Sequence, residues 1–211
     1  MNDVFFPDMV RSESYERKED GTYYDYTYYR EVILVDCKER CVYCDIVLSE
    51  MGYEGMVLDH FRPQKKFPLL KNDPSNLVSA CPKCNRLKSQ HWPIPPEQNA
   101  THDNVVGFID PFFSGRGQYF FTQEDGTLLA ARGPSEYLIK LLNLNRESRK
   151  IIRRRRILRA RLTRALVRID ESLETILAML QRDLSPAEKE HVKGKLADLR
   201  ALNSSVQAFL V

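Results

Sequence analysis

The sequence predicts an α+β protein with two strands and a helix around a bound metal ion, then a small β-hairpin unit, then a C-terminal helical hairpin. Two Cys-x-x-Cys pairs, Cys41/Cys44 and Cys81/Cys84, have metal-ligand spacing. Apolar residues recur at heptad-like helical spacing over residues 151–180. By these features we divide the chain into residues 1–36, acidic and aromatic; 37–100, the metal-clamped core; 101–134, a small strand unit and connector; and 135–211, an Arg-rich helical region.

The composition indicates a soluble globular protein with one core, or a small core plus an appended element, since 43% of the 211 residues are hydrophobic and 29% are charged. No apolar run approaches the ~20 residues that span a bilayer, and the N-terminal residues lack the pattern of a secretory signal. Five cysteines, four of them in close pairs, favour metal binding in a reducing compartment, so we expect a cytoplasmic location. Cys37 is left over, and we interpret it as a buried thiol.

The formal net charge of +3 hides an uneven distribution. Residues 1–36 hold nine acidic and four basic residues, whereas residues 61–88 hold seven Lys and Arg against one acid. Residues 145–168 hold eleven Lys and Arg against one acid. Two strongly basic stretches on a nearly neutral protein indicate localised contact with a polyanion.

In the first segment, Tyr24, Tyr26 and Tyr28 alternate as on one face of a strand. Such a ladder could stack nucleobases, but packing against the core is the favoured interpretation. In the core segment, residues 52–61 predict a strand that ends at an Asp-His pair. A second extended stretch starts at Asn76, and a helix is expected to follow it directly.

The second half of the chain predicts a hairpin and then helices. Residues 105–110 form one expected strand, and an Asp125-Gly126 turn joins two more. Helix is expected from Ser135 onward, and a capping box at residues 185–188 starts the last helix. The apolar stripe of this helical hairpin is interpreted as core or as a seam for a partner.

The runs LDHFRPQ and NLVSACPKCNRLK, together with the two cysteine pairs, resemble the HNH endonuclease motif in its zinc-clamped form. The resemblance covers about 50 of the 211 residues. It implies a ββα-metal core in which Cys41, Cys44, Cys81 and Cys84 hold one structural zinc ion. The third signature position, often histidine in this family, is Asn85 here, as in many members.

The resemblance also implies the roles of the remaining polar residues. His60 would be the general base that activates water. Asp59 and Asn85 would hold one divalent catalytic metal ion, Mg²⁺ or Mn²⁺. Asn76 would support the loop and orient the base.

Basic residues near this motif and in the Arg-rich region are candidate nucleic-acid contacts. The candidates are Lys88, Arg86, Arg62, Arg153 and Arg156. Surface solvation is the alternative for each of them. For the Arg-rich run, a phosphate-tracking face, a solvated helix face and a seam for an acidic protein partner all stay open.

The sequence therefore predicts a metal-dependent HNH endonuclease that cleaves nucleic acid, with DNA favoured. The pattern IDPF…DG…LLNLNR also resembles, less specifically, stand-alone HNH nucleases of prokaryotic phage-defence systems of the Septu or Zorya type. Such nucleases often work beside an ATPase, which would be the expected protein partner. The alternatives are a non-catalytic zinc module that binds nucleic acid or scaffolds a complex, and an RNA-cleaving HNH nuclease.

Overall fold

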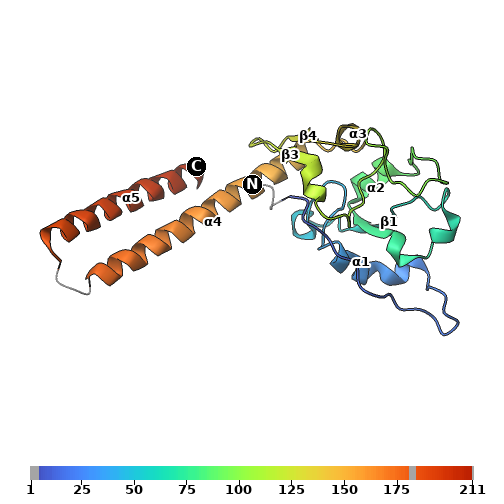
Figure 1. Cartoon of the computed structure of the whole chain (residues 1–211), viewed down its shortest axis with the longest axis horizontal. Helices are drawn as coiled ribbons and strands as arrows, with labels where there is room; N and C mark the ends of the chain where they lie inside the picture. Colours follow the sequence, from blue (N-terminus) through green and yellow to red (C-terminus); the bar gives the residue numbers. More distant parts are fainter. Residues whose placement is uncertain (1–4, 181–183, 211) are drawn as a thin grey trace. The chain divides into compact units, whose positions relative to one another are not determined.

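The computed structural model describes residues 5–180 and 184–210, and the chain divides into two compact units (Figure 1). The first unit runs to Arg153 and the second starts at Arg154. The helices and strands are α1 (Arg30–Asp36), β1 (Val57–His60), β2 (Leu77–Ala80), α2 (Pro82–Lys88), β3 (Phe120–Thr122), β4 (Leu128–Ala130), α3 (Ser135–Leu141), α4 (Glu147–Leu180) and α5 (Pro186–Leu210).

The first unit is built around the antiparallel pair β1–β2, with the register His60↔Leu77. Every residue of β2 is buried, and α2 follows it directly. The predicted strand-strand-helix core is confirmed, but β1 is shorter than the expected residues 52–61. Gly52 and Gly55 take φ values of 63° and 66°, a left-handed backbone that glycine allows and a strand does not. The chain therefore becomes extended only at Val57.

The helix α2 begins where two local signals predict a start. Cys81 occupies the N-cap position, and its Sγ accepts a hydrogen bond from the Cys84 backbone N–H at 3.5 Å. Pro82 is the first helical residue, where its missing N–H costs nothing. At the other end, Ser89 takes a φ of 47°, and α2 ends there.

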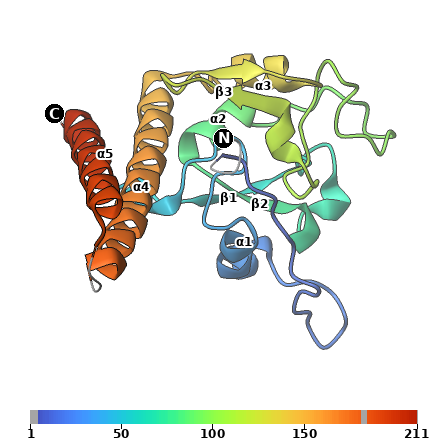
Figure 2. The ribbon, with the colours of Figure 1, turned by 60° about the vertical axis from the view of Figure 1, so that its left-hand side comes forward.

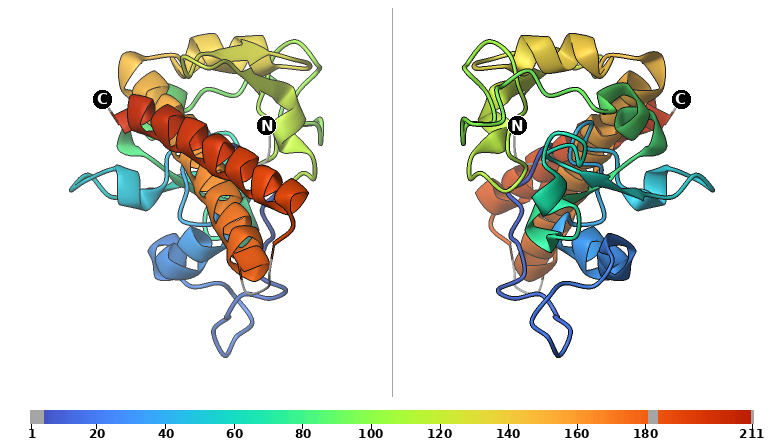
Figure 3. Two further views of the ribbon diagram at one scale, coloured as in Figure 1. Left: turned by 90° about the vertical axis from the view of Figure 1, so that its left-hand side faces the viewer. Right: turned by 90° about the vertical axis from the view of Figure 1, so that its right-hand side faces the viewer.

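The tyrosine alternation does not form a strand, which corrects the expectation from the sequence. Tyr26–Tyr29 is a 3₁₀ turn. The Asp25 carboxylate accepts hydrogen bonds from the backbone N–H and the hydroxyl of Thr27, so it favours a turn over an extended chain. The Tyr24 and Tyr28 rings stack at 4.2 Å between centroids. After this turn α1 packs on β1 and β2, on the side away from the β3–β4 hairpin (Figures 2 and 3).

The predicted hairpin at Asp125-Gly126 is confirmed as β3–β4, with α3 packed on β4 (Figure 2). Residues 105–110, expected to be a strand, form none and carry a single bridge, His102↔Gly107. Gly107 has a φ of 120°, and a Cβ there would lie 2.4 Å from the Thr101 carbonyl oxygen. The chain turns tightly at this point, which prevents an extended run.

Aromatic rings fill the core of the first unit next to β1. The Trp92 and Phe108 rings stack at 5.6 Å, and Phe61 meets Trp92 edge-on at 5.4 Å. All three side chains are buried. They fix the chain after α2 against the residue that follows β1, and so hold both sides of the candidate site.

The second unit contains most of α4 and all of α5, which run side by side in opposite directions (Figure 1). The predicted capping box is confirmed. The Ser185 N–H donates to Glu188 Oε2 at 2.8 Å, and the Glu188 N–H donates to Ser185 Oγ at 3.3 Å. Ile176 is buried, whereas Leu166 and Leu173 of the predicted stripe are exposed. The side chain of Leu180 lies outside the described residues. In the described part, no helix is long and apolar enough to cross a membrane.

Candidate functional site

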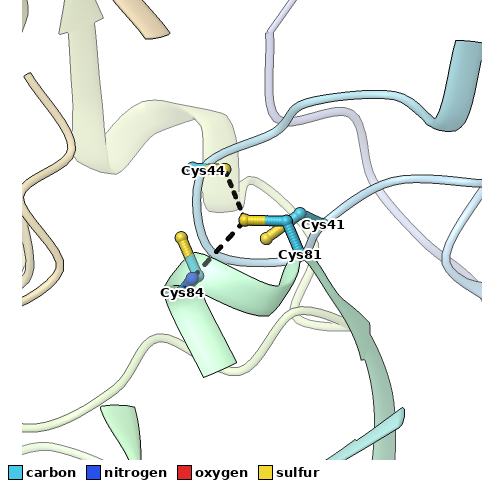
Figure 4. Close-up of side chains that lie close together, drawn as sticks. All are labelled: Cys41, Cys44, Cys81 and Cys84. Atoms are coloured by element: carbon cyan, nitrogen blue, oxygen red, sulfur yellow. Dashed lines mark hydrogen bonds between the residues drawn. The ribbon is translucent and has the colours of Figure 1, made fainter. Parts of the chain in front are cut away.

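The two cysteine pairs come together in a single cluster. Cys41 and Cys44 lie on a turn before β1, while Cys81 and Cys84 lie at the start of α2, and the four side chains point toward one another (Figure 4). All four sulfur atoms lie within 4.8 Å of one another, and all four residues are buried. A turn and a helix start that are 36 residues apart in the sequence thus meet at one point.

The geometry of this cluster fits zinc. A Zn–S bond of about 2.3 Å places the sulfurs of a tetrahedral site about 3.8 Å apart. The Sγ atoms of Cys44 and Cys81 are 3.7 Å apart. Four thiolates complete the coordination sphere, so the site suits a structural ion and leaves no open position for a substrate. Cys37 stays outside the cluster, buried, with its Sγ accepting a hydrogen bond from the Ser79 N–H at 3.3 Å.

His60 lies at the end of β1 beside a polar pocket of about 370 Å³. Its Nε2 is 2.8 Å from the Lys71 carbonyl oxygen. A carbonyl oxygen can only accept, so Nε2 carries the proton and Nδ1 remains an acceptor. The Tyr26 ring packs on the imidazole at 4.9 Å between centroids. The imidazole is therefore held in one tautomer with a basic nitrogen available, which is what a general base needs.

Asp59, the residue before His60, points to the interior, where Lys88 and Tyr43 bind it. The Lys88 ammonium lies 3.0 Å from Asp59 Oδ2, and the Tyr43 hydroxyl donates to the same oxygen at 2.5 Å. Lys88 also donates to the His60 carbonyl oxygen at 2.7 Å. These contacts fix the side chain of Asp59 and the backbone at His60.

Burial opposes ionisation throughout this network. Burial raises the pKa of Asp59, against the opposing effect of the Lys88 charge. Burial likewise lowers the pKa of Lys88, against the charge of Asp59. Burial also raises the pKa of Tyr43, and the Asp59 charge adds to it. Each group is thus costly to bury alone, and the network depends on all its members being present.

Asn76 supports the loop after β1, but it does not contact His60. Its Oδ1 accepts from the Arg62 N–H at 2.9 Å, and its Nδ2 donates to the carbonyl oxygens of Arg62 and Leu70 at 3.0 and 3.3 Å. Leu70 precedes Lys71, whose carbonyl oxygen orients His60. The orienting role of Asn76 stays a prediction, and any effect on His60 would pass through this loop.

Asn85 and Arg86 bring the second turn of α2 to the same pocket as His60. The pocket is lined by Tyr26, Leu58, Asp59, His60, Pro63, Gln64, Asn85, Arg86, Ser89 and Gln90. Asp59, His60 and Asn85, the predicted catalytic set apart from Asn76, therefore share one opening. Arg86 is exposed at its rim, where a phosphate could reach it.

Two of the predicted nucleic-acid contacts are placed where no phosphate can reach them, and these placements correct the expectation. Lys88 is fully buried in the Asp59 network. Arg153 is 2% exposed, and its guanidinium donates to the carbonyl oxygens of Gly126 and Leu144 at 2.6 and 2.8 Å. A charged side chain whose spacing suits phosphate contact can instead be buried and hydrogen-bonded inside the core. The sequence alone does not distinguish these two placements.

The other two candidates keep part of their surface. Arg62 is half-buried, lies over the Phe67 and Trp92 rings, and donates to the Asn99 carbonyl oxygen at 2.7 Å. Arg156 is half-buried on α4. Neither placement decides whether these side chains bind nucleic acid, so both remain predictions.

Sequence reasoning missed two residues of the site. Tyr43 lies inside the first Cys-x-x-Cys pair and binds Asp59, and Tyr26 lies 34 residues before His60, whose ring it covers. A tyrosine between two metal ligands is a weak signal that could have drawn attention to Tyr43. Nothing local indicates Tyr26, because its contact depends on how the N-terminal segment wraps around the core.

Comparisons with known proteins agree with this geometry. Residues 41–91 match the model of the HNH endonuclease family. The chain is similar to the Septu protein PtuA of Bacillus mycoides (strain KBAB4), at 26% identity over 127 residues, covering 51% of this chain and 18% of that protein. The match thus spans less than a fifth of the relative's length. No solved structure matches the chain. Residues 41–91 of this protein form an HNH endonuclease domain.

Proposed function

We propose that this protein is a metal-dependent endonuclease that hydrolyses phosphodiester bonds, most readily in DNA. One observation carries the proposal. The Lys71 carbonyl oxygen fixes His60 with Nδ1 as the free acceptor, beside an open polar pocket that also contains Asp59 and Asn85. A module that only binds nucleic acid has no need to bring His60, Asp59 and Asn85 together in one pocket.

His60 acts as the general base in this proposal. A water molecule in the pocket donates a proton to Nδ1 as its oxygen attacks the phosphorus atom. The bond from phosphorus to the 3′ oxygen breaks, and a solvent water molecule protonates the departing 3′ oxygen. The resulting imidazolium is stabilised by the hydrogen bond from Nε2 to the Lys71 carbonyl oxygen. The Tyr26 ring on the imidazole limits its rotation during this transfer. Arg86 at the rim binds an adjacent phosphate and holds the strand in place.

A divalent ion, Mg²⁺ or Mn²⁺, held by Asp59 and Asn85 would supply charge neutralisation on the phosphate and on the departing oxygen. The donor set fits such an ion, since carboxylate and amide oxygens are the ligands that hard cations prefer. Tyr43 and Lys88 already bind the Asp59 carboxylate. A carboxylate offers about four lone pairs, so it can still accept one further contact from the pocket side.

A role in antiviral defence is part of the proposal. The similarity to a Septu protein supports it, and a protein partner such as a defence-system ATPase would then control the nuclease. Four thiols that bind zinc must stay reduced, so we infer that the protein works in the cytoplasm.

The test uses the purified full chain with labelled DNA and RNA of one sequence, with Mg²⁺, with Mn²⁺, and with EDTA. We expect DNA cleavage with either metal and none with EDTA. Preferential cleavage of the RNA would instead favour an RNA-cleaving HNH nuclease. Binding without cleavage of either substrate, with both metals and in the presence of a candidate partner, would identify a non-catalytic zinc module and overturn the proposal.

A further inference from the structure

Arg146, the residue before α4, and Arg149, in its first turn, direct two guanidinium groups at the cysteine cluster. Arg149 Nε lies 3.3 Å from the Cys44 sulfur, and its Nη2 lies 3.5 Å from the Cys81 sulfur. Arg146 Nη2 lies 3.5 to 3.8 Å from the sulfurs of Cys44, Cys81 and Cys84. These are hydrogen-bond distances for sulfur acceptors, so three of the four cysteines receive an arginine donor.

These arginines do not behave as surface charges. Arg149 is 8% exposed. Arg146 is half-buried and uses its other nitrogen on the carbonyl oxygens of Leu142 and Asn143, at 3.2 and 3.0 Å. Both side chains are therefore fixed in position, and the hydrogen bonds to sulfur are part of that arrangement.

The chemistry of a four-thiolate site explains why cations would gather there. Four thiolates around one Zn²⁺ leave two excess negative charges. Buried charge is costly unless it is paired and hydrogen-bonded. Two guanidinium groups supply two positive charges and up to five N–H donors each. Donors from residues that do not bind the metal directly tune metal affinity and fix the ligands.

We propose that Arg146 and Arg149 neutralise the zinc–thiolate cluster, slow the release of its zinc ion and fasten the start of α4 to it. The first part of the Arg-rich run thus serves the metal site. Arg149 is thus assigned to the metal site and not to contact with phosphates.

The experiment follows zinc transfer from the purified, zinc-loaded full chain to a coloured chelator. Arg149→Gln and Arg146→Gln should each release zinc about tenfold faster, because loss of such outer residues typically lowers metal affinity about 10–100-fold. Arg149→Lys, which keeps the charge but loses the fork of donors, should lie between wild type and Arg149→Gln. The matched control is Arg155→Gln, an exposed arginine on the same helix, which should release zinc at the wild-type rate.

Cobalt substitution gives a second measurement that packing alone would not change. Hydrogen bonds to a thiolate lower the energy of its sulfur lone pairs. Removing them in Arg149→Gln should therefore move the sulfur-to-Co²⁺ charge-transfer band to longer wavelength. If Arg149→Gln does not fold, Arg146→Gln, at the half-buried position, carries both measurements. Unchanged zinc release and an unchanged band in the folded variants would overturn the proposal, even if their melting temperatures fall. Neither readout involves cleavage, so the outcome is independent of the proposed nuclease activity.

Discussion

The cysteine cluster and the His60 pocket both use residues of α2, yet they are opposite kinds of site. The cluster lies at the first turn of α2, is buried, and its four sulfur atoms converge on one point. The pocket lies at the next turn, where Asn85 and the exposed Arg86 meet His60 at an opening of about 370 Å³. Two consecutive residues, Cys84 and Asn85, thus belong to a closed site and an open one, because successive residues of a helix point about 100° apart.

The difference teaches which site holds the fold and which is available for chemistry. A closed site contributes its binding energy to folding, whereas an open one keeps a group such as His60 Nδ1 available. The two are joined by Tyr43, which lies between Cys41 and Cys44 in the sequence and binds Asp59. We therefore expect damage to the cluster to reach the pocket, and damage to the pocket to leave the cluster intact.

The largest effect should come from the closed site. Cys81→Ala, or removal of zinc by a strong chelator, should unfold residues 41–91. Structural zinc contributes about 10–16 kcal/mol in zinc-finger peptides, which matches or exceeds the total stability of a typical domain, about 5–15 kcal/mol. Circular dichroism and elemental analysis measure the outcome. Folded, soluble protein without tightly bound zinc would contradict a structural role for the cluster.

A substitution in the open site should instead abolish activity and leave the fold intact. His60→Ala should lower the cleavage rate roughly 10²–10⁴-fold, the usual contribution of a general base. Its zinc content and melting temperature should stay close to wild type, because the ring lies at the edge of the core, against the Tyr26 ring and the Lys71 carbonyl oxygen. Wild-type cleavage by this variant would remove His60 from the mechanism.

A third change tests the network that lies between the two sites. Lys88→Met leaves Asp59 buried without its cation, which costs about 3–5 kcal/mol for buried pairs. We expect the lower end, about 3 kcal/mol, since Tyr43 still donates to the carboxylate. Urea unfolding measures the decrease in stability. The double variant Asp59→Asn/Lys88→Met should recover part of it, and equal decreases in the single and double variants would argue against a coupled pair.

The stability of the Lys88→Met variant should also change with pH in a defined direction. Burial already raises the pKa of Asp59, and removal of the Lys88 charge raises it further. A carboxyl group whose folded-state pKa exceeds its unfolded-state pKa lowers stability as pH rises between the two values. The stability deficit of Lys88→Met should therefore shrink toward acidic pH. A deficit that grows on acidification would show that Asp59 is not the group left unpaired.

The sequence predicted the cysteine cluster better than it predicted the N-terminal segment. Cys41 and Cys81 could be assigned to one cluster because metal-ligand spacing is a local signal. The tyrosine alternation failed because Asp25 closes a turn by its own side chain, which periodicity does not register. Lys88 was taken for a surface group because no local signal reveals that its ammonium turns inward to Asp59.

The smallest effect is expected in the Arg-rich run, in which some arginines are buried and others are exposed. Arg153→Gln removes donors to two core carbonyl groups, so it should lower stability. Arg154→Gln/Arg155→Gln changes two exposed side chains and should leave the melting temperature unchanged. If Arg154 and Arg155 bind phosphates, the log–log dependence of DNA affinity on salt should flatten by about 0.9 for each phosphate that the variant no longer neutralises.

Titration of the Arg154→Gln/Arg155→Gln variant with DNA at several salt concentrations distinguishes the remaining interpretations. A flatter slope with an unchanged cleavage rate at saturating DNA supports phosphate binding by these arginines, because the pocket groups at His60 and Asn85 are unaltered. An unchanged slope rules it out for these two positions. The outer part of the run then serves a protein partner or is simply solvated, and failure of complex assembly in the same variant would decide between those two.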